Sequence, residues 1–217
     1  MQYRAIIFDL DGTLLNTIED LALAANSVLL RHGCPEHPVE AYKYFVGDGI
    51  DLMVQRAFPA GYVRQEKSEQ LVSEVKEEYG RRWVEHTTPY PGIPELLTFL
   101  EERQIPKAIF SNKPHEFALL TVETLLGRWR FVEVLGISPL MPRKPNPHGA
   151  LIIASKLGLK PQEIVYLGDT ATDMQTARQG GFFPAAALWG FRLPDELQDA
   201  GAEFLAGSPQ DLQTLFI

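Results

Sequence analysis

Several short polar runs in this chain carry residue types that can do chemistry, and each follows an apolar run. The run Tyr3–Phe8 ends at Asp9, with Asp11 two positions further on. The other such residues are Ser111, Asn112 and Lys113 after Ile105–Phe110, Lys144 in the loop after Phe131–Leu135, and Asp169 and Asp173 after Ile164–Leu167. Together they supply carboxylates, amines and a hydroxyl, the groups that phosphoryl transfer uses.

Phosphoryl transfer would give each of these groups a role. A carboxylate such as that of Asp9 can attack phosphorus and form a covalent intermediate, which divides one difficult step into two easier ones. Asp11 can protonate the leaving alkoxide and later deprotonate the attacking water. Mg²⁺ commonly takes one or two carboxylates with water and substrate phosphate, and Asp9 and Asp169 could supply them. The groups expected to hold the remaining phosphate oxygens are Ser111, Asn112, Lys113 and Lys144.

These residues must be brought together in space, and a parallel sheet would do so. Five apolar segments bounded by turn residues predict buried parallel strands, Tyr3–Phe8, Ile105–Phe110, Phe131–Leu135, Ile164–Leu167 and Phe183–Leu188, with an edge strand at Glu203–Ala206. Helical patterns lie between the later strands, at Pro94–Arg103, Pro114–Leu126, Pro147–Leu157 and Thr172–Gln179. This alternation predicts an α/β fold with a doubly wound sheet, which binds ligands beyond the carboxyl ends of its strands. Pro114 is expected in the first turn of its helix.

The stretch from residue 17 to 84 breaks the alternation. It has helical periodicity in Ile18–Arg31, Val39–Phe45, Ile50–Phe58 and Glu66–Val84, without a strand pattern. The proline- and glycine-rich run Thr87–Gly92 then returns the chain to the sheet. The sequence therefore predicts two domains, a core of residues 1–16 and 85–217 and an all-helical insert of residues 17–84.

The polar runs resemble the motifs of the haloacid dehalogenase superfamily of phosphohydrolases. The four matching runs, in the superfamily's order, are Phe8–Leu14, Ser111–Pro114, Lys144–Pro145 and Gly168–Asp173. The resemblance implies a Rossmann-like core with a helical cap, and Mg²⁺ as the cofactor. It also implies that Asp9 is nucleophile and metal ligand, that Asp11 is acid/base and offers its backbone carbonyl to the metal, and that Lys144 is catalytic. Asp169 would be a metal ligand, and Asp173 would hold a metal-bound water or orient Lys144.

The predicted cap carries a segment that bears on the substrate. Lys43–Ile50, with Gly47 and Gly49, resembles the specificity loop of phosphoglycolate phosphatases, where Lys43 replaces a frequent Arg. Lys43, Gly47 and Arg56 are therefore candidate substrate-binding residues. We expect hydrolysis of 2-phosphoglycolate or a similar small phosphoester. A sugar-phosphate mutase, a pyrophosphatase and, in a different class, a phospho-accepting signalling module are the alternatives.

Composition limits the kinds of partner and location. With 20 Lys and Arg against 28 Asp and Glu, the formal net charge is −8. An acidic chain of this kind is not suited to broad binding of nucleic acid or an anionic membrane surface. Cys34 is the single cysteine, so no intrachain disulfide can form, and the N-terminus shows no secretory signal pattern. We expect a cytoplasmic protein, a monomer or homodimer, whose partner is a small-molecule phosphoester.

Overall fold

The computed structural model describes residues 3–217 and divides the chain into two compact units. One unit combines residues up to Leu15 with Pro89–Ile217, and the other is Asn16–Thr88. The second boundary between the units lies between residues 88 and 89, later in the chain than the predicted boundary between residues 84 and 85. Asp20 explains the difference, because its carboxylate accepts hydrogen bonds from the backbone N–H groups of His86 and Thr87 and so attaches this part of the chain to the helical unit.

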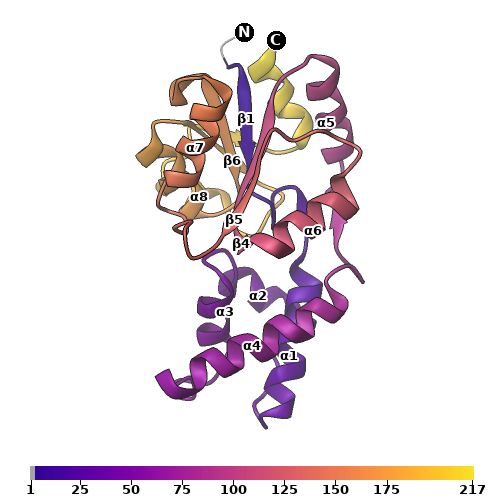
Figure 1. The fold of residues 1–217 in the computed structure, drawn as a ribbon, viewed down its shortest axis with the longest axis vertical. Helices are drawn as coiled ribbons and strands as arrows, with labels where there is room; N and C mark the ends of the chain where they lie inside the picture. The colour runs from indigo at the N-terminus through magenta and orange to yellow at the C-terminus, as the bar shows by residue number, and fades with distance from the viewer. Residues whose placement is uncertain (1–2) are drawn as a thin grey trace. The chain divides into compact units, whose positions relative to one another are not determined.

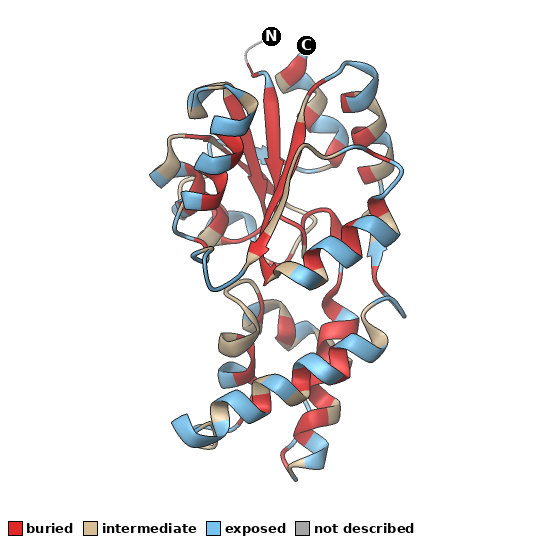
Figure 2. Ribbon diagram, viewed as in Figure 1, coloured by how far each residue is buried: buried red, intermediate tan, exposed pale blue. Residues whose placement is uncertain are grey.

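The first unit is built on a six-stranded sheet of order β5-β4-β1-β6-β7-β8, in which every neighbouring pair is parallel (Figure 1). The strands are β1 (Ala5–Phe8), β4 (Lys107–Pro114), β5 (Val134–Ile137), β6 (Ile164–Gly168), β7 (Phe183–Ala187) and β8 (Phe204–Ala206). This confirms the predicted α/β fold with its doubly wound sheet. The apolar runs form strands because a parallel sheet covered on both faces buries nearly all of its side chains, as Figure 2 shows.

Helices cover both faces of this sheet. They are α5 (Ile93–Glu102), α6 (His115–Leu126), α7 (His148–Leu157), α8 (Ala171–Gly180) and α9 (Pro194–Asp199), with 3-10 helices at Pro161–Glu163 and Pro209–Phe216. Successive residues of β1 pack on opposite sides. Ile6 and Phe8 lie in one apolar cluster with residues of α5 and α6, whereas Ala5 and Ile7 lie in another with residues of α7 and α8.

The register of the central strand determines which residues meet at the carboxyl edge. Phe8 lies level with Ile109 of β4 on one side and with Leu167 of β6 on the other. Asp9 therefore leaves the sheet level with Gly168, the last residue of β6, and with Phe110 of β4, directly before Ser111. Sequence positions more than 100 residues apart meet here.

Strand β4 is longer than predicted. After an irregularity between Phe110 and Pro114, its pairing with β5 resumes at Pro114 and Ile137, so the backbone stays extended as far as Pro114. Ser111, Asn112 and Lys113 thus lie within the end of the strand and not after it. Pro114 is the N-cap of α6, with φ −52° and ψ 135°, and not a residue of its first turn.

The second unit consists of α1 (Ile18–Arg31), α2 (Val39–Phe45), α3 (Ile50–Ala57) and α4 (Gln65–Arg82), close to the four predicted helices. α1 packs on α4. Two short strands, β2 (Leu15–Asn16) and β3 (Thr88–Pro89), pair where the chain passes between the units. Among the described residues, 3–217, the structure has no helix that could span a bilayer.

Candidate active site

Three buried aspartates lie together at the carboxyl ends of β1 and β6. Asp9, Asp169 and Asp173 each offer a carboxylate oxygen, and these atoms lie within 4.8 Å of one another. Asp9 directly follows β1, Asp169 directly follows β6, and Asp173 lies in the first turn of α8. Three acids buried this closely repel one another unless positive charge is brought to them.

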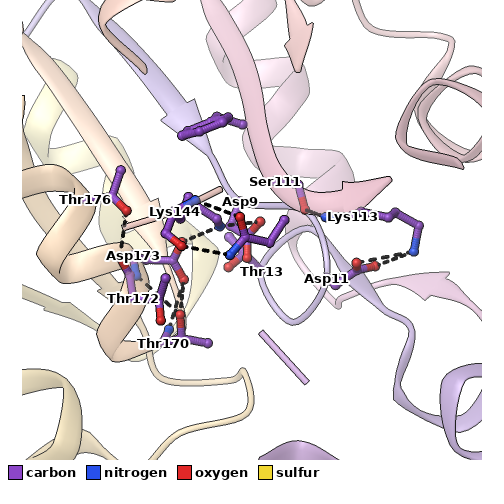
Figure 3. Close-up of polar contacts among 12 residues, drawn as sticks. Asp9, Asp11, Thr13, Ser111, Lys113, Lys144, Thr170, Thr172, Asp173 and Thr176 are labelled. Atoms are coloured by element: carbon purple, nitrogen blue, oxygen red, sulfur yellow. Dashed lines mark hydrogen bonds and ion pairs between the residues drawn. The ribbon is translucent and has the colours of Figure 1, made fainter. Parts of the chain in front are cut away.

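Lys144 supplies part of that positive charge. Its Nζ lies 2.6 Å from Asp173 Oδ1 and 2.9 Å from Asp9 Oδ1, and its side chain is 1% exposed (Figure 3). The backbone of Lys144 is held by Asn112, whose Oδ1 accepts from Lys144 N at 2.8 Å and whose Nδ2 donates to Lys144 O at 3.3 Å. A loop lysine is thereby placed between two carboxylates.

Asp173 is oriented by the start of its own helix. Thr170 is the N-cap of α8, and its backbone N–H and hydroxyl both donate to Asp173 Oδ2, at 3.1 Å and 2.6 Å. This is a capping box. It leaves Asp173 Oδ1 directed at Lys144. The predicted role of Asp173, to hold a metal-bound water or to orient Lys144, stays a prediction.

Asp169 is held at both oxygens by neutral donors. The hydroxyl of Thr13 donates to Oδ1 at 2.8 Å, and the backbone N–H of Phe191 donates to Oδ2 at 2.9 Å. Neither donor carries a charge. Hydrogen bonds from these two donors therefore stabilise the carboxylate of Asp169 without neutralising its charge.

The ionisation of the group follows from burial. Desolvation raises the pKa of Asp9 to about 7, opposed by Lys144 and aided by Asp173 and Asp11. Desolvation, together with the neighbouring carboxylates of Asp173 and Asp9, raises the pKa of Asp169. Burial opposes the charged form of Lys144, but Asp173 and Asp9 outweigh it and raise the pKa of the ammonium. Three carboxylates thus face one ammonium, and burial favours uptake of a proton by Asp9 and Asp169.

A divalent cation fits this arrangement. Among the described residues Asp9 Oδ1 is buried without a hydrogen bond, since Lys144 reaches it only as an ion-pair contact. Carboxylate oxygens are the ligands that Mg²⁺ prefers, and a cation would relieve the repulsion between Asp9 and Asp169.

Asp11 lies apart from this group. Figure 3 shows it turned toward Lys113, whose Nζ lies 2.9 Å and 3.2 Å from the two carboxylate oxygens. Ser111 is buried beside them, and its hydroxyl oxygen accepts from the backbone N–H of Lys113 at 3.2 Å. The structure thus brings the predicted core residues to one edge of the sheet, with Asp11 and Lys113 as a second charged pair.

The predicted cap residues all lie in the helical unit. Lys43 pairs with Glu40 at 2.8 Å. Arg56 pairs with Asp48 at 2.6 Å and also donates to Phe45 O at 3.0 Å. Gly47 has φ of 112°, a conformation that glycine adopts readily. Their contact with substrate stays a prediction.

A second acidic group lies in the helical unit, at Asp20, Glu85 and His86. It is not a comparable cation site, because the carboxylate oxygens of Asp20 already accept hydrogen bonds from protein groups. Its oxygens accept from His86 N, His86 Nδ1, Thr87 N and Thr87 Oγ1. The group is therefore a structural attachment of residues 86–87 to α1.

Sequence reasoning missed three features of the site. Thr13 was not recognised as a partner of Asp169, nor Asn112 as the residue that holds the Lys144 backbone. The turn Trp189–Phe191 also contacts the site. This turn follows β7. Because ligands bind beyond the carboxyl ends of parallel strands, its position could have marked it as part of the site.

Known proteins resemble this chain over nearly its whole length. Residues 6–187 match the family described as haloacid dehalogenase-like hydrolase. A phosphoglycolate phosphatase of Chromobacterium violaceum is 33% identical, with 98% of this chain and 96% of the relative covered. An N-acetylmuramic acid 6-phosphate phosphatase of Pseudomonas aeruginosa is 31% identical, with 98% and 94% covered.

Solved structures agree with the sequence matches. The crystal structure of a protein from Lactobacillus delbrueckii subsp. bulgaricus matches this chain with a TM-score of 0.92 and 31% sequence identity. The match covers 100% of this chain and 99% of that one. The strand order, the buried aspartates and these relatives lead to one conclusion. The chain belongs to the family of haloacid dehalogenase-like hydrolases.

Proposed function

We propose that the chain is a Mg²⁺-dependent phosphomonoester hydrolase that works through an aspartyl phosphate on Asp9. The observation that carries the proposal is the buried group of Asp9, Asp169 and Asp173 with Lys144 between two of them. Family membership supports hydrolysis, and the relatives described above are named as phosphatases.

Asp9 and Asp169 would hold the cation directly, with the backbone carbonyl of Asp11, and Asp173 would act through a bound water. When bound, Mg²⁺ neutralises the carboxylates and screens the approaching phosphate. Lys144 keeps Asp9 oriented through its 2.9 Å contact and adds positive charge where the transition state is negative. Ser111, a buried hydroxyl at the end of β4, would donate to a phosphate oxygen.

In the first step a carboxylate oxygen of Asp9 forms a bond to phosphorus while the bond from phosphorus to the leaving oxygen breaks. Asp11 gives its proton to that leaving oxygen. In the second step Asp11 takes a proton from water as the water oxygen bonds to phosphorus. The bond from phosphorus to the Asp9 oxygen breaks, which releases inorganic phosphate and regenerates the Asp9 carboxylate. A phosphate at Asp9 would draw Lys113 from its present contact with Asp11, because a phosphate dianion is a stronger partner for an ammonium.

The substrate proposed is 2-phosphoglycolate or a similar small phosphoester. Lys43 is the first candidate for its carboxylate, because it lies in the segment Lys43–Ile50 that resembles the specificity loop. Arg56 is already bound to both Asp48 and a backbone carbonyl. The two named relatives act on different esters, so the core motifs by themselves leave the substrate open.

A substrate panel tests the proposal. It contains an aryl phosphate, 2-phosphoglycolate, N-acetylmuramic acid 6-phosphate, a hexose phosphate and pyrophosphate, each with and without Mg²⁺ and scored by kcat/KM. We expect Mg²⁺-dependent release of phosphate, fastest from 2-phosphoglycolate. Lys43→Met should raise KM for 2-phosphoglycolate and leave the aryl phosphate unchanged, whereas Lys76→Met, at an exposed position of α4, should change neither.

The same panel separates the alternatives. Isomerisation of the hexose phosphate would indicate a mutase, and preference for pyrophosphate a pyrophosphatase. A stable phosphoprotein without turnover would indicate a signalling module. Absence of phosphate release from every substrate would refute the hydrolase, and full activity in Asp9→Asn would refute the nucleophile. Cytoplasmic location, the monomer or homodimer, and the lack of nucleic-acid or membrane partners stay predictions from the sequence.

A further inference from the structure

The turn that follows β7 contacts Asp169 directly and also contacts Thr13, which donates to the other carboxylate oxygen of Asp169. The backbone N–H of Phe191 donates to Asp169 Oδ2 at 2.9 Å. The indole Nε1 of Trp189 donates to the backbone carbonyl of Thr13 at 2.9 Å, and Thr13 in turn donates its hydroxyl to Asp169 Oδ1 at 2.8 Å. Each carboxylate oxygen of Asp169 is therefore reached from this turn, one directly and one through Thr13.

Glycines on both sides allow this close approach. A Cβ placed on Gly190 would lie 2.2 Å from Asp169 Cβ and 2.5 Å from Gly12 O. A Cβ placed on Gly12 would lie 2.3 Å from Asp169 Oδ2 and 2.7 Å from Phe191 Cε2. No side chain larger than hydrogen fits at either position without displacing these neighbours, so the side chain of Asp169 is enclosed between the two backbones.

We infer that Trp189–Phe191 is a positioning element that sets the direction of the Asp169 carboxylate toward the cation. A carboxylate oxygen has two lone pairs, so a single neutral donor on each oxygen leaves the other lone pair for a metal ion. Partners of this kind orient ligands and tune metal affinity. The inference rests on the proposed Mg²⁺ site, and it assigns Trp189 and Phe191 a role that no motif of the sequence indicates.

A purely structural role for the turn makes a different prediction. If Trp189 only filled space, a ring of similar shape would preserve cation affinity, and any loss would appear as lower stability of the metal-free protein. If the indole N–H positions Asp169 through Thr13, its removal weakens cation binding while the metal-free protein stays folded.

Trp189→Phe removes the indole N–H and keeps an aromatic ring at a half-buried position. Trp129→Phe is the matched control, because the indole of Trp129 donates to Thr98 Oγ1 at 3.1 Å in the same unit but away from the site. The readouts are the Mg²⁺ dissociation constant from titration calorimetry and the Tm of the metal-free protein. We expect about fivefold weaker Mg²⁺ binding in Trp189→Phe, the change that one lost hydrogen bond produces, and no change in Trp129→Phe.

Two further variants keep the test decisive. Thr13→Val removes the direct donor to Asp169 Oδ1 at nearly constant volume, and we expect Mg²⁺ binding about 10- to 100-fold weaker. Asp169→Asn tests the site itself and should abolish binding. If Asp169→Asn binds Mg²⁺ normally, the proposed metal site is wrong. If Asp169→Asn abolishes binding but Trp189→Phe matches wild type, or if both tryptophan variants weaken binding equally, the positioning role is refuted and the metal site stands.

Discussion

Replacement of Lys144 by methionine tests whether burial decides the strength of an ion pair in this protein. Methionine keeps an unbranched side chain and fills similar space, but it removes the ammonium that lies 2.6 Å from Asp173 and 2.9 Å from Asp9. With an effective dielectric constant of about 20, each contact corresponds to a gross attraction of about 6 kcal/mol. Desolvation of the ammonium offsets several kcal/mol of this.

The net cost follows from what remains after the change. Asp9, Asp169 and Asp173 would stay buried within 4.8 Å of one another without their nearest positive charge. Removing one partner of a buried pair costs about 3–5 kcal/mol. For a chain of this length, that corresponds to a fall in Tm of about 6–20 °C.

The assay is differential scanning calorimetry in EDTA at neutral pH, with Lys156→Met as the control. The Nζ of Lys156 lies 2.6 Å from Glu133, as close as the tighter contact of Lys144, but its side chain is 51% exposed. We expect less than about 1 kcal/mol for that change. Equal shifts in the two variants would refute the argument that burial makes the Lys144 contacts strong.

A double-mutant cycle locates the effect. Asp173→Asn removes one of the acids that Lys144 neutralises, so the loss in Lys144→Met/Asp173→Asn should be smaller than the sum of the two single losses. We expect a coupling of about 1–3 kcal/mol. Additive losses would show that Lys144 stabilises the protein by packing and not through Asp173.

Three further outcomes are expected. Removal of divalent ions with EDTA should lower Tm and abolish phosphatase activity, and Mg²⁺ should restore both where Na⁺ does not. Gly12→Ala should destabilise far more than Gly158→Ala, because both glycines have positive φ but only at Gly12 would the added Cβ meet Asp169, at 2.3 Å; denaturant titration measures both. The hydrogen bond to Asp20 raises the pKa of His86, so the stabilisation that His86 provides is full below its unfolded pKa and lost as pH rises through its higher folded value. The stability difference between wild type and His86→Ala should therefore shrink with rising pH, and a difference that grew would contradict this assignment.

Local patterns account for the parts of the fold that the sequence predicted. Strands β1 and β6 could be predicted from the sequence because strands buried on both faces consist almost wholly of apolar residues. The helices α1 and α2 begin and end where their periodicity predicted. Each of these features depends on residues near one another along the chain.

The end of β4 shows where local patterns fail. The sequence places Ser111–Pro114 after a strand, because the apolar run stops at Phe110. Pairing of Pro114 with Ile137 of β5 keeps these residues extended. Whether a polar segment stays in a sheet depends on a partner strand that the segment itself does not encode.

The sequence by itself determined the reaction chemistry that this chain could carry, because the position of Asp9, Asp11 and Asp169 after apolar strands places carboxylates at one edge of a parallel sheet. Only the tertiary structure decided how those carboxylates are held. The hydrogen bond from Trp189 to Thr13 joins residues 176 positions apart. The hydrogen bond between the Asn112 side chain and the Lys144 backbone depends on the irregular end of β4. Such contacts depend on the direction of side chains in the packed molecule, and no spacing within a single segment predicts that direction.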